Sequence, residues 1–170
     1  MLSRNQGIDT LLATIVQLKS KGSPIRFLIV GFPEEEYRNK AIELGIDRVI
    51  IFTGRIDYNK TPFYLCAGDI AVSPKVSLIE SNSTLLNYMA CGLPTVAFDM
   101  PVNRELLGDA GVYAKYDDAG DLATKLALLM EHKEERDRLS RLGREQAEQR
   151  HSWDSRGKVL DEIYRKKLRR

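Results

Sequence analysis

Two spacings of hydrophobic residues alternate along the chain as far as residue 114. In one, apolar residues such as Leu11, Ile15 and Leu18 recur at the spacing of one helix face. In the other, short continuous apolar runs such as 27–30 have the composition of strands that are buried on both faces. Helices that alternate with such strands predict an α/β domain, with a parallel sheet and helices on both of its faces.

Glycine and proline residues mark where the predicted elements begin and end. Proline at the first position of a helix and glycine just past its last residue are both favoured by backbone geometry. Asp9 is the predicted N-cap of the first helix, because a short polar side chain there can accept hydrogen bonds from free backbone N–H groups. The predicted strands are 25–31, 49–54, 70–74, 95–98 and 111–114, and the helices between them begin near residues 8, 33, 62, 83 and 101.

After the last predicted strand, apolar residues follow helical spacing to the end of the chain. Asp117 or Asp118 is the predicted cap of the first helix of this tail, and Trp153 is expected to anchor the last helix by burying its ring. The fold expected for 1–170 is therefore one doubly wound, Rossmann-like α/β domain, with 117–170 as a helical extension of it.

Composition and charge narrow the class of protein. The 170 residues fit one domain, and their 43% hydrophobic and 29% charged content is typical of a globular protein in water. A net charge of +2 favours no nucleic-acid partner. No apolar run has the roughly 18 residues that are needed to span a bilayer. Two cysteines do not indicate a disulfide framework, so we expect a reducing, cytoplasmic location.

The two cysteines and two histidines are too few and too far apart to predict a metal site or a disulfide framework. Cys66 and Cys91 lie within apolar helical patterns and are expected to be buried thiols. His132 and His151 fall in the helical tail, outside every predicted strand exit, and are expected to be structural or solvated.

Ligands of doubly wound sheets bind outside the carboxyl ends of the strands. We expect the loops at those ends to converge on one crevice, since all parallel strands end at the same edge. The loops concerned are 31–33, 54–56, 74–83 and 99–104.

The helix that begins after Ser83 is the strongest candidate for contact with a phosphorylated ligand. Its first N–H groups can hydrogen-bond an anion, and Ser81, Ser83 and Thr84 can add hydroxyl donors. The same small polar residues also suit a helix cap, so both interpretations stay open.

The stretch from Leu85 to Val96, LLNYMACGLPTV, closely resembles the donor-site helix of the group 1 glycosyltransferases. Other stretches resemble that family in the same order along the chain. Residues 4–12 resemble its basic-residue-then-glycine opening, 54–70 resemble its middle segment, and the helix that begins at Ser152-Trp153 resembles its closing helix. The resemblance covers essentially the whole chain. It implies the GT-B architecture, in which two Rossmann-like domains hold the active site between them.

The resemblance also implies a function. The chain would be the C-terminal, nucleotide-sugar-binding domain of a retaining glycosyltransferase of glycan biosynthesis, with the N-terminal acceptor domain absent. Such an enzyme moves a sugar from a nucleotide-diphosphate sugar to an acceptor hydroxyl, needs no cofactor or metal, and would be inactive as this domain alone.

The implied partners are the nucleotide sugar, the missing N-terminal domain of the same enzyme, and a lipid-linked acceptor at a membrane surface. The basic end, 165–170, can attach the protein peripherally to the inner membrane face through anionic lipids. Cations at the end of a helix are also favoured by the helix dipole, so this basic end does not by itself require a membrane.

Two other functions stay open. A non-catalytic nucleotide-binding or protein-interaction domain on the same fold is favoured by departures from the family pattern at Asn87 and Gln6. A different GT-B class, such as a sugar epimerase or a phosphorylase-like protein, is the third interpretation. The phosphorylase-like protein would need a lysine for its cofactor, which the sequence does not identify.

The family usually presents two glutamates, at positions that correspond here to Ile79 and Asn87. The second contacts the nucleotide ribose, and the Asn87 amide can still hydrogen-bond ribose hydroxyls. The first lies near the donor sugar, and Glu80, the residue after Ile79, is the predicted sugar-side carboxylate. The alternatives are a solvated loop acid at Glu80 and a surface amide without a ligand at Asn87.

The remaining predicted donor contacts lie along the strand exits. Arg4 stands where the family has basic phosphate-binding residues, whereas Gln6 replaces the expected lysine. Lys75 can approach phosphate or stay solvated, and Arg104 can reach phosphate or form an ion pair within the domain. The backbone of 54–56 would frame the base. The predicted set is Glu80 as catalytic residue, with Arg4, Gly31, Gly54, Arg55, Ile56, Lys75, Ser83, Thr84, Leu85 and Asn87 as donor-binding residues and no metal ligand.

Overall fold

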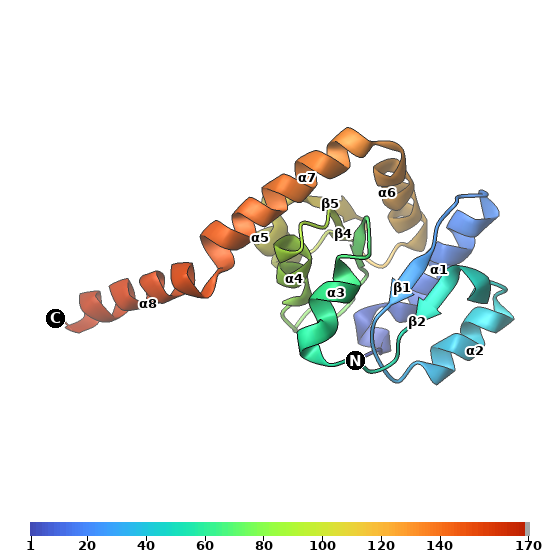
Figure 1. Ribbon diagram of the computed structural model, residues 1–170, viewed down its shortest axis with the longest axis horizontal. Coiled ribbons are helices and arrows are strands. Elements are labelled where there is room, and N and C mark those ends of the chain that lie inside the picture. The colour runs from blue at the N-terminus through green and yellow to red at the C-terminus, as the bar shows by residue number, and fades with distance from the viewer. Residues whose placement is uncertain (169–170) are drawn as a thin grey trace.

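Five short strands form the centre of the fold in the computed structural model, which describes residues 1–168 (Figure 1). They are β1 Phe27–Ile29, β2 Ile50–Phe52, β3 Ala71–Ser73, β4 Thr95–Phe98 and β5 Gly111–Ala114. One sheet holds β1 and β2, and a second holds β3, β4 and β5 in that order. Every pairing between these strands is parallel, as expected, and each covers only three or four residue pairs.

The two-stranded sheet is buried on one face only. Leu28 and Ile51 are register partners with 37% and 54% of their surface exposed, whereas Phe27 and Phe52 are buried in the core. The prediction that the first strand is buried on both faces is therefore wrong. An unbroken apolar run has no period of two, so the pattern could not distinguish the covered face from the open one.

The helices between the strands lie where they were expected, with one corrected boundary. Gly7, at φ 72°, is the N-cap of α1 Ile8–Ser20, so the predicted N-cap Asp9 lies in the first turn instead. There its carboxylate pairs with Lys40 at 3.1 Å and with Arg4 at 3.5 Å. The other helices of this region are α2 Glu35–Glu43, α3 Thr61–Leu65, α4 Thr84–Ala90 and α5 Pro101–Leu107.

The helical tail begins as predicted. The Asp118 carboxylate accepts hydrogen bonds from the N–H groups of Gly120 and Asp121, and so caps α6 Ala119–Glu131. This helix packs against α1. The tail continues through α7 Lys133–Gln146, which packs against α4, and through a π-helical turn, Ala147–His151.

The last helix, α8 Trp153–Leu168, projects from the rest of the domain, and none of its residues is buried (Figure 1). Trp153 is 93% exposed, so the prediction that its ring anchors the helix is wrong. Leu160, Tyr164 and Leu168 follow it at helical spacing and are exposed as well. The hydrophobic pattern correctly indicated a helix with an apolar face, but that face packs against nothing within residues 1–168.

The predicted basic end of the chain is described only in part. Residues 169 and 170 lie outside the described residues. Arg165, which is described, forms an ion pair of 2.7 Å with Asp161 one turn earlier. Among residues 1–168, no helix combines the length and the apolar character that crossing a membrane requires.

The hydrophobic core has two parts. The larger lies between the strands and the pair of α1 and α6, where Ile15 and Leu129 are fully buried. The smaller lies under α4, where Leu85 and Met89 pack with Leu107 of α5. Burying a leucine side chain contributes roughly 1.5–3 kcal/mol, so these contacts fix α4 firmly beside the three-stranded sheet.

Candidate functional site

The loop 74–83, which follows β3, contains an ion pair of its own. Lys75 Nζ lies 3.0 Å from Glu80 Oε2 and donates a hydrogen bond of 2.7 Å to the carbonyl of Ser81. The Lys75 side chain is 8% exposed and that of Glu80 is 48% exposed. A buried ammonium needs a charged partner to offset its lost hydration. The two predicted site residues therefore lie together, with the amine turned inward and the carboxylate at the surface.

Two buried amides hold the far end of this loop. Asn82 Nδ2 donates to Ser73 Oγ and to Asn103 Oδ1, both at 2.9 Å. Asn103 Nδ2 donates in turn to the carbonyl of Phe98 at 2.8 Å. Ser73 and Phe98 are the last residues of β3 and β4, so the two amides connect neighbouring strand exits. Sequence patterns did not point to them, because Asn82 lies in an irregular loop without periodicity, and a single asparagine in a helix as short as α5 does not indicate burial at Asn103.

The N-terminal segment packs across the strand exits. Leu2 N donates to the carbonyl of Phe32, just after β1, at 2.7 Å. The carbonyl of Asn5 accepts from Val76 N, just after β3, at 3.0 Å. These bonds hold the exposed side chain of Arg4 at the same edge as loop 74–83.

The exits of β1 and β2 meet at two glycines. Gly31 and Gly54 form an isolated antiparallel bridge, and Gly54 has a φ of 67°, which favours glycine. The exposed guanidinium of Arg55 stacks on Phe32, 5.0 Å from the ring centre. Ile56, the next residue, is half-buried. The residues predicted to surround a nucleotide base therefore lie side by side.

Helix α4 presents its first turn at the end of the same loop. Ser83 is the N-cap residue, but its hydroxyl makes no capping hydrogen bond, and both Ser83 and Thr84 are exposed. Leu85 is fully buried in the core, which leaves only its backbone to meet a ligand. Asn87 is partly exposed. The hydroxyls are therefore available to a ligand. If Ser83 capped the helix, its hydroxyl would instead be used within the chain.

Arg104 is engaged within the domain. Its guanidinium makes a two-pronged ion pair with Asp99, with 2.7 Å between Nη2 and Oδ2, and it stacks on Tyr113 at 4.4 Å from the ring centre. Hydrogen bonding from Arg104 holds the pKa of the Asp99 carboxyl below its usual value. Of the two interpretations of Arg104, the intradomain ion pair is the one that the structure shows.

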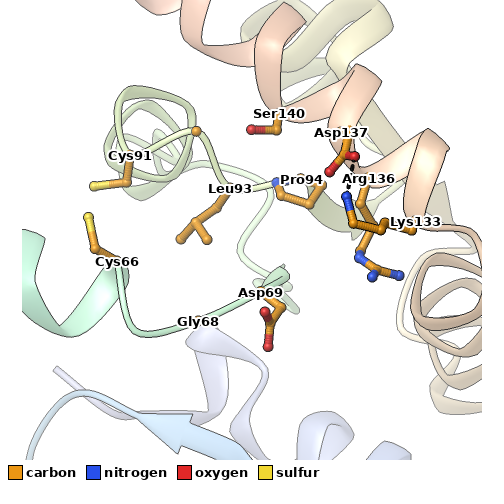
Figure 2. Close-up of a pocket in the computed structure, with 11 residues that line it drawn as sticks. Cys66, Gly68, Asp69, Cys91, Leu93, Pro94, Lys133, Arg136, Asp137 and Ser140 are labelled. Carbon is orange, nitrogen blue, oxygen red and sulfur yellow. Dashed lines mark hydrogen bonds and ion pairs between the residues drawn. The ribbon is translucent and has the colours of Figure 1, made fainter.

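A pocket of about 280 Å³, shown in Figure 2, is lined by none of these residues. Its walls are formed by 66–69 and 91–94, which lead into the amino ends of β3 and β4, and by side chains of α7 such as Lys133. It is therefore at the opposite edge of the three-stranded sheet from the strand exits. Lys133 is paired with Asp137, so its charge is already engaged.

The two cysteines line this pocket, with their sulfur atoms turned toward each other (Figure 2). Cys66 is exposed and Cys91 is partly buried, so the prediction of two buried thiols is wrong. Each is the C-cap residue of its helix, α3 or α4, where the packed face has ended. Burial, and then the neighbouring Cys66, raise the pKa of the Cys91 thiol. Within residues 1–168, no three His, Cys, Asp or Glu side chains are grouped to hold a metal ion.

The chain is similar in sequence to known proteins. A family model described as "Glycosyl transferases group 1" matches residues 1–132. The phosphatidyl-myo-inositol mannosyltransferase of Mycolicibacterium smegmatis is 30% identical over 129 residues, which are 74% of this chain and 33% of that protein. The chain spans about a third of the length of the curated relatives that it matches.

Solved structures share the fold, among them the following two. Anabaena Alr3699/HepE, solved in complex with UDP, has a TM-score of 0.82 and 20% identity over 97% of this chain and 46% of that one. The C-terminal domain of a glycosyl transferase group 1 family protein (LpcC) from Francisella tularensis has a TM-score of 0.74 and 22% identity over 89% of this chain and 83% of that one. The expected Rossmann-like α/β fold is thereby confirmed.

Proposed function

Because the chain belongs to the group 1 glycosyltransferases, we propose that it is the donor-binding domain of an enzyme that moves a sugar from a nucleotide-diphosphate sugar to an acceptor hydroxyl. The observation that carries the proposal is the meeting of four segments at one edge: the N-terminal segment, the Gly31–Gly54 bridge, loop 74–83 and the first turn of α4. Doubly wound domains bind nucleotides at this edge. In the proposal, 1–170 form one domain and 117–170 are its helical extension.

The diphosphate would lie at the first turn of α4. The exposed Ser83 and Thr84 offer backbone N–H and hydroxyl donors there. The side chain of Arg4 adds positive charge, since it is 90% exposed although it lies 3.5 Å from the Asp9 carboxylate. Lys75 would act on the ligand indirectly, because its ammonium is turned inward to Glu80 and to the carbonyl of Ser81.

The sugar and the nucleoside would lie on either side of the diphosphate. Glu80 would accept hydrogen bonds from sugar hydroxyls, and a charged acceptor makes such bonds about twice as strong as a neutral one. The neutral Asn87 amide would contact the ribose. The backbone of 54–56 would frame the base, beside the bridge that holds it to Gly31.

The domain would contribute to catalysis by positioning the donor and by stabilising charge on the leaving diphosphate. The family resemblance supports transfer with retention. In the proposal the acceptor is bound by an N-terminal domain, so 1–170 bind the nucleotide sugar but transfer nothing by themselves.

Two observations support the proposed partners. The apolar face of α8, with Trp153, Leu160 and Tyr164 exposed, suits packing against the N-terminal domain, since contiguous apolar surface of this kind is usually covered. The similar mannosyltransferase is named for phosphatidyl-myo-inositol, which supports a lipid acceptor and a working place at the cytoplasmic face of a membrane.

Isothermal titration tests donor binding. The 170-residue chain would be titrated with UDP, GDP and ADP and with a sugar conjugate of each. We expect one nucleotide to bind with a Kd below about 1 mM, which corresponds to about −4 kcal/mol. Glu80→Gln should weaken the sugar conjugate more than the plain nucleotide, whereas Glu43→Gln, at the exposed end of α2, should weaken neither. No binding of any of them at millimolar concentration would refute the proposal.

A non-catalytic nucleotide-binding domain is the second candidate, because Asn87 replaces a family glutamate. Transfer by the full-length protein with Asn87, lost in Asn87→Glu, would identify the amide as a working residue. Nucleotide binding without transfer by either form would favour the non-catalytic domain.

A further inference from the structure

We propose that Asn82 and Asn103 form a positioning pair for the donor site, which fixes loop 74–83 and with it Glu80 and the first turn of α4. That the site binds a nucleotide rests on the proposed function, whereas the effect of the pair on the position of the loop does not.

The hydrogen-bond donors and acceptors of Asn82 and Asn103 fit their partners in only one orientation of the two amides. The Asn82 amide has two hydrogens, and they go to Ser73 Oγ and Asn103 Oδ1, both at 2.9 Å. Asn103 accepts with its oxygen and donates with its nitrogen to the carbonyl of Phe98 at 2.8 Å. Rotating the Asn103 amide by half a turn would place nitrogen against nitrogen and oxygen against oxygen. The pair therefore has one stable orientation.

Burial makes this orientation costly to lose. Asn82 is 3% exposed and Asn103 is fully buried. Hydrogen bonds between such groups are strengthened by the low local dielectric, and a buried amide left without a partner loses its hydration with nothing in exchange. Within residues 1–168, every fully buried polar side-chain atom has a hydrogen-bond partner, those of this pair included.

The pair reaches the site through the backbone of Asn82. Its carbonyl accepts from Leu85 N at 3.0 Å, which starts the first turn of α4. On its other side, Asn82 stands two residues after Glu80, whose carboxylate is held by Lys75. The loop is thus held at its start by the Lys75 ion pair and by bonds of Val76 and Ser77 to the carbonyl of Asn5, and at its end by the amides. Among residues 1–168, the polar contacts of the exposed stretch 78–81 are the ion pair of Glu80 with Lys75 and the hydrogen bond from Lys75 to the carbonyl of Ser81, so the position of Glu80 depends on how the two ends of the loop are held.

The test uses Asn82→Ala, Asn103→Ala and the double variant of the 170-residue chain. Hydrogen exchange of residues 76–86, followed by mass spectrometry, reports on the loop without a ligand, and titration with UDP reports on the site. We expect each single variant to speed exchange in the loop, and to weaken UDP binding, by about tenfold, since one lost buried hydrogen bond is worth roughly that factor. The double variant should be no worse than the more severe single one, because both break the same series of bonds.

Thr14→Val is the matched control. Thr14 is fully buried, and its Oγ1 donates to the carbonyl of Thr10 at 2.8 Å, in α1 and away from the loop. This variant should lower the unfolding temperature and leave loop exchange and UDP affinity as in the wild type. If it weakens UDP binding as much as Asn103→Ala at an equal loss of stability, the pair has only a general structural role and the inference is overturned.

Ser73→Ala replaces the asparagine variants in this test if they do not fold, because it removes one hydrogen bond and leaves the bond between the two amides in place. We expect it to speed loop exchange by a smaller factor than the asparagine variants. Unchanged exchange in Ser73→Ala and in every asparagine variant that folds would overturn the inference. A wild-type chain that binds no nucleotide would instead refute the proposed function, and the exchange measurement would still decide the role of the pair.

Discussion

Lys75 and Glu80 form an ion pair whose two ends differ in burial: the lysine side chain is 8% exposed and the glutamate side chain is 48% exposed. The carboxylate therefore keeps much of its water, whereas the ammonium depends on Glu80 and on the carbonyl of Ser81. Because of this difference in burial, removing the glutamate and removing the lysine should lower the free energy of unfolding by different amounts.

We expect Glu80→Gln to destabilise the chain more than Lys75→Met. The first change leaves a buried ammonium without its counter-charge, and the second leaves a half-exposed carboxylate that water can solvate. The expected losses in the free energy of unfolding are about 2 and about 1 kcal/mol, measured by urea denaturation. The double variant should lose less than the sum of the two. Equal losses for the two single variants would show that the burial difference has no energetic effect.

Gly7→Ala should destabilise the chain far more than Gly22→Ala. Both glycines have nearly the same φ, 72° and 73°, so both substitutions carry the same backbone strain. A Cβ at Gly7 would lie 1.7 Å from the carbonyl oxygen of Pro74, whereas one at Gly22 meets nothing within 4 Å. Strain alone costs about 1 kcal/mol, which lowers the unfolding temperature by roughly 2–4 °C in a chain of this size. In a thermal scan, Gly7→Ala should lower the unfolding temperature several times more than this. Equal shifts for the two variants would contradict the close approach of Gly7 to Pro74.

Trp153 gives an optical test of the exposed face of α8. It is the one tryptophan of the chain and is 93% exposed. We expect its fluorescence to resemble that of tryptophan in water and to be quenched by acrylamide almost as readily. In the full-length protein, the emission should shift to the blue and the quenching should fall, because the proposed N-terminal domain would cover the ring. Blue-shifted emission from the 170-residue chain alone would contradict the exposed position.

The two thiols should react at different rates. Cys66 is exposed, whereas the raised pKa of the partly buried Cys91 keeps that thiol protonated at a pH at which an ordinary thiol begins to ionise. Only the thiolate is nucleophilic, so alkylation of Cys91 should be slower than that of the exposed Cys66 at neutral pH, and it should rise with pH over a higher range than that of an ordinary thiol. Peptide mass mapping after brief alkylation measures both rates. Unfolding in urea should make them equal, and a faster Cys91 in the folded chain would contradict the burial.

Much of the fold could be predicted from local rules. Helix α5 and strand β5 have the predicted residues, because Pro101 begins the helix and the glycines at 108 and 111 separate it from the strand. The errors about burial share a cause. Leu28, Cys66 and Trp153 were all expected to be buried because they are apolar, and a pattern of apolar residues cannot show what lies opposite them.

The candidate site was predicted as a set of loops but not as a set of contacts. Parallel strands end at one edge by necessity, so the topology alone predicted that the strand exits converge. The bond from Lys75 to Glu80 and the bond from Asn82 to Asn103 depend on how an irregular loop folds back on itself. No periodicity governs such a loop, and its side-chain partners become visible only in three dimensions.

The projecting position of α8 should make the chain associate with itself in solution. Its 16 residues extend for about 24 Å at 1.5 Å per residue, with an apolar stripe along the length. Two such helices can cover each other's stripes, so self-association should grow with protein concentration and fall with mild detergent. Removal of 153–170 would leave both core clusters intact, and the shortened chain would be the better sample for crystallisation and for NMR spectroscopy.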